Sequence, residues 1–233
     1  DLKEIFKAIN FSLSENGILI LEDPSLLQCL KAVAYDQFYC EHIYVFSALS
    51  LKNILKNFDL EIFYIENIKT HGGSNRYYIK KISNTKNKIN INVKKEIHKE
   101  INFGLNKFAT YKKFQKRVNK SKFELLKILN QLKNKKLNII GYGATAKSCT
   151  VLNFCKIDKQ LIDYFIDTTP NKINKYLPGS KIKVKKYNKL NKKNIDVAYL
   201  GAWNFKEEIL RKERNFISKG GKFITHVPFP KLI

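Results

Sequence analysis

The chain has 233 residues, of which 44% are hydrophobic, and this is enough to form the core of one large domain or the cores of two ordinary ones. It contains no uninterrupted apolar run of about 18 residues and no N-terminal signal pattern, so we expect a cytoplasmic protein without a membrane span. The net charge of +24 comes from lysines spread over nearly every polar segment. Because the lysines are not clustered, AT-rich codon usage explains the charge better than specific nucleic-acid binding does. The charge can still attract an anionic substrate.

Cysteine and methionine usage gives two further limits. The cysteines, Cys29, Cys40, Cys149 and Cys155, form no Cys-x-x-Cys pair, so we expect reduced thiols and no metal site. The sequence begins at Asp1 and contains no methionine. We therefore expect a fragment or a processed piece of a longer chain.

The first elements in the chain are an amphipathic helix and an apolar strand. Apolar residues at helical spacing predict a helix over residues 2–14. The continuous apolar run over residues 17–22 predicts a strand buried on both faces of a parallel sheet. Because the carboxyl ends of such strands face the ligand crevice, Glu22 and Asp23 are expected near an active site and are candidates for cofactor binding.

The next segment has the element order of a methyltransferase sheet. A helix is predicted over residues 47–58, and strands are predicted over 60–68 and 76–82, joined by a turn that contains Gly72 and Gly73. This order matches the last third of a Rossmann-like methyltransferase sheet, whose final strand runs antiparallel between its two predecessors. The first strand of such a sheet, with its glycine-rich turn, is missing.

The middle of the chain is expected to connect two domains. Residues 83–93 are polar and of low complexity, which predicts a linker or a surface loop. Two helices are predicted between residues 94 and 135. We therefore expect three parts: residues 1–93 as the end of a methyltransferase domain, 94–136 as bridging helices, and 137–233 as a second Rossmann-like α/β domain.

A glycine-rich turn opens this second domain. The strand predicted over residues 137–140 leads into the Gly-x-Gly-x-x-Ala motif over 141–146, and Asp167 follows the next predicted strand, over 161–166. Such a turn favours phosphate binding by helix N-terminal amides. Lys147 either reaches an anion or is simply solvent-exposed. The expected ligand edge runs over residues 141–147, 167–172 and 203–204, and later strands are predicted over 196–201 and 223–227.

Residues 35–46 crowd titratable and aromatic side chains around His42. An imidazole exchanges a proton near neutral pH, Glu41 is placed to tune that proton, and Tyr39 is able to donate to an oxyanion. A histidine among aromatic residues is more often structural than catalytic, so this stretch alone does not establish a site.

Five motifs, in a fixed order, resemble those of the sugar C-methyltransferases, which act on nucleotide-linked keto-sugars in deoxysugar biosynthesis. They lie at residues 36–42 with Phe46, and at 70–76, 141–147, 177–179 and 202–204. The resemblance covers residues 17–228. It implies an enzyme with a zinc-binding N-terminal region, an S-adenosylmethionine domain and a C-terminal Rossmann-like domain. The zinc region and the front of the methyltransferase domain are not in this sequence, so zinc is not expected.

The resemblance also implies roles for individual residues. The family's Tyr-x-Glu-His motif falls on Tyr39, Glu41 and His42, with the histidine as the base that removes the proton beside the ketone. The other two residues would orient or stabilise the enolate, which attacks the methyl sulfonium. The expected substrate-binding residues are His71, Gly72, Gly73, Arg76, Tyr142, Gly143, Ala144, Lys147, Asp167, Lys172, Trp203 and Asn204.

Three other functions remain open from the residues alone. A non-catalytic nucleotide or nucleotide-sugar binding module would use the same glycine-rich turn. An NAD-dependent oxidoreductase would use that turn together with Asp167. A nucleic-acid binder has the least support. The sequence does not indicate the sugar, the nucleotide base, the methylated carbon or the oligomeric state.

Overall fold

The computed structural model describes all 233 residues, which form two compact units. The first unit comprises residues 1–31 and 44–114, and the second comprises residues 32–43 and 115–233. This division differs from the expected boundaries after residues 93 and 136. The segment that contains Tyr39 and His42 belongs to the second unit, because Asp36 is buried there among residues of the second sheet.

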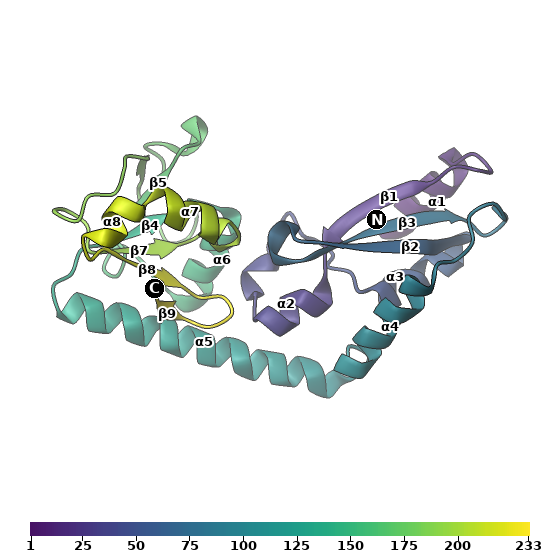
Figure 1. The fold of residues 1–233 in the computed structure, drawn as a ribbon, viewed down its shortest axis with the longest axis horizontal. Helices are drawn as coiled ribbons and strands as arrows, with labels where there is room; N and C mark the ends of the chain where they lie inside the picture. Colours follow the sequence, from purple (N-terminus) through teal and green to yellow (C-terminus); the bar gives the residue numbers. More distant parts are fainter. The chain divides into compact units, whose positions relative to one another are not determined.

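The first unit is built on a three-stranded antiparallel sheet in the order β1-β3-β2 (Figure 1). Its elements are α1 (Leu2–Ser12), β1 (Leu19–Pro24), most of α2 (Leu26–Ala32), α3 (Ala48–Leu55), β2 (Leu60–Ile68), β3 (Ser74–Lys81), α4 (Ile91–Phe103) and the start of α5 (Phe108–Asn134). Strand β3 pairs antiparallel with both β1 and β2. The predicted position of the last strand between its two predecessors is therefore confirmed.

The expectation that β1 is buried on both faces was wrong. Side chains along β1 alternate between half-buried and exposed, and Ile20 is 57% exposed. The physical reason is that β1 is an edge strand of a sheet that has its hydrophobic core on one face. That core includes Phe6, Leu51, Tyr77 and Ile79.

A carboxylate from α4 caps the start of α3. Ser47 is the N-cap of α3 and forms a capping box with Ser50. The buried Glu100 adds a second cap, since its two oxygens accept hydrogen bonds from the backbone amides of Ala48 at 2.7 Å and Leu49 at 2.8 Å. These bonds join two helices that are far apart in the sequence.

We expect Glu100→Gln to lower the free energy of unfolding by about 1–2 kcal/mol. The amide keeps one acceptor but turns a donor group toward the second backbone N–H. Urea denaturation followed by circular dichroism measures the change. Glu4→Gln, at an exposed position on α1, is the control. Equal midpoints for the two variants would show that the cap contributes nothing to stability.

The second unit is a Rossmann-like α/β sheet (Figure 1). Its strand order is β6-β5-β4-β7-β8-β9. Its main elements are β4 (Ile139–Tyr142), α6 (Ala146–Cys155), β5 (Phe165–Asp167), β6 (Val184–Lys186), β7 (Val197–Leu200), α7 (Lys206–Lys212), α8 (Arg214–Ser218), β8 (Lys222–Thr225) and β9 (Lys231–Leu232). All neighbouring strands are parallel except β8 and β9. Strands β6 and β9 were not predicted from the sequence. Both are short edge strands, β6 of three residues and β9 of two.

Strands β4 and β7 lie side by side at the centre of this sheet, and the chain leaves them in opposite directions. It passes from β4 through α6 to β5, and from β7 through α7 and α8 to β8. In open α/β sheets, the carboxyl ends of two such strands border the ligand crevice. No helix of the chain combines the length and hydrophobicity that crossing a membrane requires.

Candidate active site

The Tyr39–His42 turn holds an imidazole in a defined orientation. The 3-10 helix η1 (Tyr35–Gln37) precedes it, and the backbone amide of His42 donates to the carbonyl of Tyr39 at 2.9 Å. His42 Nδ1 lies 2.8 Å from the carbonyl oxygen of Gln37. A carbonyl only accepts hydrogen bonds, so Nδ1 carries the proton and the lone pair of the neutral ring is on Nε2. Nε2 is therefore the nitrogen of the neutral ring that can accept a proton.

The Tyr39 hydroxyl lies beside that lone pair, 3.2 Å from His42 Nε2, and the two ring centroids are 4.3 Å apart. Partial burial raises the pKa of Tyr39, and the nearby carboxylates of Glu41 and Asp36 raise it further. The phenol therefore stays protonated at neutral pH and remains a hydrogen-bond donor.

Glu41 lies at a small cavity of the second unit and is exposed. The cavity has a volume of about 290 Å³ and is lined by the glycine-rich turn, the start of α6 and the segment between β5 and β6. Its polar lining residues include Glu41, Thr145, Cys149, Asn171, Lys172, Lys175 and Tyr176. The structure thus brings together Glu41, Ala144 and Lys172 from the predicted set. Sequence reasoning gave Cys149, Lys175 and Tyr176 no role in a site, because none stands in a recognisable motif.

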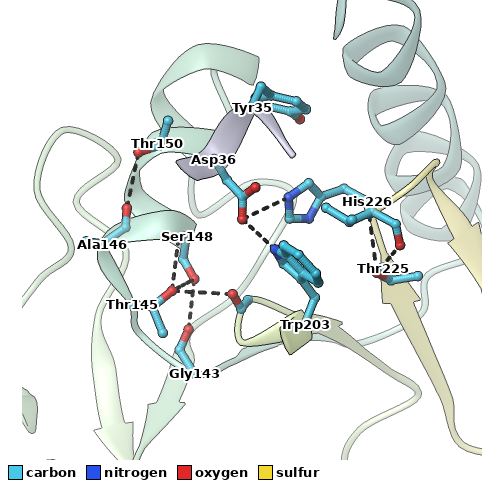
Figure 2. A network of polar contacts seen from close by, with 12 residues as sticks. Tyr35, Asp36, Gly143, Thr145, Ala146, Ser148, Thr150, Trp203, Thr225 and His226 are labelled. Carbon is cyan, nitrogen blue, oxygen red and sulfur yellow. Dashed lines mark hydrogen bonds and ion pairs between the residues drawn. The ribbon is translucent and has the colours of Figure 1, made fainter. Parts of the chain in front are cut away.

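The amides of the glycine-rich turn are used within the protein. The Ala144 amide donates to Asp167 Oδ2 at 2.8 Å, and the Ser148 amide donates to Thr145 Oγ1, the N-cap of α6, at 3.1 Å. Figure 2 shows Ser148 Oγ also bonded to the Gly143 carbonyl, at 2.9 Å. The donors that a phosphate would use in a dinucleotide-binding turn are therefore partly occupied.

The glycines of this turn are needed for packing. A Cβ on Gly141 would lie 2.3 Å from the ring of Phe165, and one on Gly143, where φ is +87°, would lie 2.9 Å from the Cβ of Ala202. Neither distance allows a side chain without movement of the neighbouring residue. The motif is thus explained by helix and strand packing without a bound ligand.

Tyr142 and Lys172, two other predicted residues of this edge, have hydrogen-bond partners in the protein. Tyr142 is buried, and its hydroxyl donates to Glu213 at 3.1 Å, which directs it into the core. Lys172 Nζ donates to the carbonyl of Ala144 at 2.8 Å and lies 3.8 Å from Asp167. Asn204 is half-buried in the 3-10 helix η5 (Trp203–Phe205).

Trp203 and Lys147 do not line the cavity beside Glu41. The indole Nε1 of Trp203 donates to Asp36 Oδ2 (Figure 2). Lys147 Nζ lies 5.6 Å from the centre of the indole ring. His226 Nε2 approaches the same oxygen of Asp36 to 3.4 Å. No role was predicted for His226, or for Asp36 by itself, because no local sequence pattern links residues so far apart in the chain.

The first unit contains the glycine-rich joint between β2 and β3. His71, Gly72 and Gly73 have φ values of +53°, +86° and +124°, and His71 and Gly72 are exposed. Gln28, Asn67 and the two glycines line a cavity of about 310 Å³. A Cβ on Gly73 would lie 2.9 Å from the side chain of Gln28, so the cavity wall depends on this glycine.

The charged residues near that joint form ion pairs with one another. Arg76 contacts Glu22 and Glu66, each at 3.0 Å, and Thr70 Oγ1 donates to Glu22 at 3.2 Å. Asp23 Oδ2 accepts the backbone amide of Phe46 at 2.9 Å. Glu22, Asp23 and Arg76 therefore each have a structural role in the first unit. No three histidine, cysteine, aspartate or glutamate side chains in the protein are grouped as a metal site requires.

Comparison with known proteins places the chain in a family. Residues 69–228, more than half of the chain, match the family described as the C-methyltransferase C-terminal domain. The chain therefore belongs to this family. The predicted resemblance to C-methyltransferases is confirmed.

One curated relative covers the whole chain. The C-methyltransferase NovU of Streptomyces niveus is 27% identical to it over all 233 residues. The chain spans 55% of the length of that relative.

Proposed function

We propose that this chain provides the proton-abstracting and substrate-binding part of an S-adenosylmethionine-dependent methyltransferase that acts on a nucleotide-linked keto-sugar. The observation that supports this most directly is the 2.8 Å contact between His42 Nδ1 and the carbonyl of Gln37. It leaves Nε2 as the basic nitrogen of the neutral ring. The family match supports methyl transfer to carbon, which requires a carbon nucleophile.

The proposed step is removal of the proton on the carbon beside the ketone. His42 Nε2 takes the proton, the C–H bond breaks, and its electron pair forms the enolate with the negative charge on the former ketone oxygen. Tyr39 rotates its hydroxyl from Nε2 toward this oxygen and donates a hydrogen bond to it. The position of the Tyr39 hydroxyl, 3.2 Å from His42 Nε2, supports this role.

S-adenosylmethionine is the proposed methyl donor. The arrangement of β1, β3 and β2 supports the interpretation of the first unit as the end of a Rossmann-like methyltransferase sheet. Glu22 and Asp23, the candidates at the end of β1, already accept hydrogen bonds from Arg76 and Phe46. These two carboxylates by themselves do not form a donor site, so we assign them no step in methyl transfer.

The cavity beside Glu41 is the proposed site for part of the nucleotide-linked sugar. Lys172 and Lys175 place positive charge at its wall, and Asn171 and Thr145 add polar groups. A sugar nucleotide carries a diphosphate, which such a lining attracts. The net charge of +24 adds a general attraction for the same anion.

The alternative functions have less support. An NAD-dependent enzyme would need the amides of the glycine-rich turn, and the Ala144 amide is bonded to Asp167 instead. A non-catalytic binding module would give no reason for the fixed tautomer of His42. The family match favours the methyltransferase over both.

Deuterium exchange without a methyl donor tests the proposal. The protein is incubated in D₂O with UDP- or dTDP-linked 4-keto-6-deoxyhexoses, and proton NMR follows the carbon beside the ketone. We expect deuterium to enter faster than in protein-free buffer. The same sugar nucleotides with a hydroxyl in place of the ketone are the control, and exchange no faster than in buffer would refute the proposal.

A further inference from the structure

The side chain of Asp36 lies at the carboxyl edge of the second sheet. It is fully buried, Trp203 follows β7, and His226 follows β8, so both of its partners come from the carboxyl edge of the sheet (Figure 2). The 3-10 helix η1, which carries Asp36, packs against α6. The place where open α/β sheets hold a ligand is therefore occupied by a carboxylate of the protein itself.

The surroundings of Asp36 stabilise a negative charge. Burial alone would raise the pKa of Asp36, but His226, the Trp203 indole N–H and Lys147 outweigh it, and the pKa lies below its usual value. Lys147 is 6% exposed and lies against the indole ring. Removing one member of such a buried set leaves another charge uncompensated, so the arrangement is held as a unit.

His226 is held in place from its other side. Its Nδ1 lies 3.0 Å from the hydroxyl of Tyr199, and the two rings are stacked with centroids 5.8 Å apart. With Nδ1 accepting from Tyr199, Nε2 carries the hydrogen that faces Asp36. The ring of Tyr35 packs edge-on against His226 at 5.6 Å, so η1 has an aromatic contact with His226 as well as the contact of Asp36.

The same short helix carries the hydrogen-bond partner of His42. Gln37 follows Asp36 directly in η1, and its carbonyl accepts from His42 Nδ1 at 2.8 Å. Any movement of Asp36 out of the crevice moves this carbonyl. A short stretch of backbone thus connects the edge of the second sheet to the carbonyl that fixes the tautomer of His42.

We propose that Asp36 is a positioning residue, which docks residues 35–43 in the crevice of the second sheet and thereby holds the Tyr39–His42 pair ready for proton abstraction. The proposal rests on the proposed function of His42. It also assigns Trp203 to holding the protein's own carboxylate, in place of its predicted contact with the substrate.

The test compares Asp36→Asn with Asp163→Asn in the same protein. Both variants lose a carboxylate from the second unit, but Asp163 pairs with Lys133 on the surface and has no contact with η1. Nitrogen-15 NMR of the imidazole reads the tautomer of His42 without substrate. Hydrogen exchange of the Trp203 indole N–H reads docking, since Trp203 is the single tryptophan of the sequence. Deuterium exchange into the keto-sugar nucleotide gives kcat and KM separately.

In Asp36→Asn we expect at least about 10-fold faster exchange of the indole N–H, loss of the Nδ1–H tautomer signal, and a fall in kcat of at least about 10-fold with KM little changed. Asp163→Asn should leave all three as in the unmodified protein. Unchanged His42 signals in Asp36→Asn, an unchanged kcat, or equal losses in both variants would overturn the proposal.

If Asp36→Asn does not fold, His226→Gln tests the same positioning role. It keeps the carboxylate and removes the imidazole, and we expect the same change in the His42 signals. Normal His42 signals in folded His226→Gln would count against the proposal. If the unmodified protein exchanges no deuterium, the proposed function fails, whereas intact exchange that is insensitive to Asp36 overturns the positioning role alone.

Discussion

Replacing His42 by asparagine is expected to lower the rate of deuterium exchange beside the ketone by about 10²- to 10⁴-fold, the usual contribution of a general base. Asparagine can still occupy the turn, but it offers no basic nitrogen at neutral pH. Proton NMR in D₂O with the keto-sugar nucleotide measures the rate. The fold should persist, because His42 is only half-buried.

Two companion variants sharpen the interpretation of this result. His98→Asn removes an exposed histidine of α4 and should leave the rate unchanged. Tyr39→Phe keeps the base but removes the donor beside it, and we expect a loss of about 10²- to 10³-fold, as for other oxyanion donors. If His42→Asn exchanges as fast as the unmodified protein, another group must be the base.

Replacing Gly141 by alanine is expected to destabilise the second unit by about 1–3 kcal/mol or more. The added methyl group would lie 2.3 Å from the ring of Phe165, within a fully packed sheet. Interiors of this density do not accept extra atoms without moving side chains or backbone. Urea denaturation measures the loss.

A second substitution tests whether packing is the cause. Phe165→Leu shortens the side chain that the new methyl group meets, so the double variant Gly141→Ala with Phe165→Leu should be less destabilised than the sum of the two single changes. Strict additivity would show that Phe165 is not the reason for the glycine. Deuterium exchange by the folded double variant would further show that the turn needs no glycine at this position for catalysis.

The glycine-rich motif and the residues proposed for proton abstraction have different roles. A Gly-x-Gly-x-x-Ala turn between a strand and a helix is typical of phosphate binding. In this protein, Asp167 and Thr145 satisfy amides that a phosphate would bind. The proposed chemistry instead depends on the turn that holds His42 and on the cavity beside Glu41.

The sequence by itself determined the elements that depend on neighbours along the chain. Helical spacing predicted α3, and the two glycines before β3 predicted the joint to β2. The order of elements also predicted that β3 lies between β1 and β2. Boundaries were less accurate, and β4 begins two residues later than expected, at Ile139. Such patterns repeat over two to four residues, so they are readable without knowledge of the fold.

Only the tertiary structure decided how distant residues meet. Asp36, Trp203 and His226 come together because three chain segments converge at the carboxyl edge of one sheet, and no local periodicity records that convergence. The exposed face of β1 has the same origin, since burial depends on what packs against a strand and not on the apolar residues in it. The sequence identified His42 as the candidate base, and the fold supplied the Gln37 carbonyl that fixes its tautomer and the buried carboxylate proposed to hold that carbonyl in place.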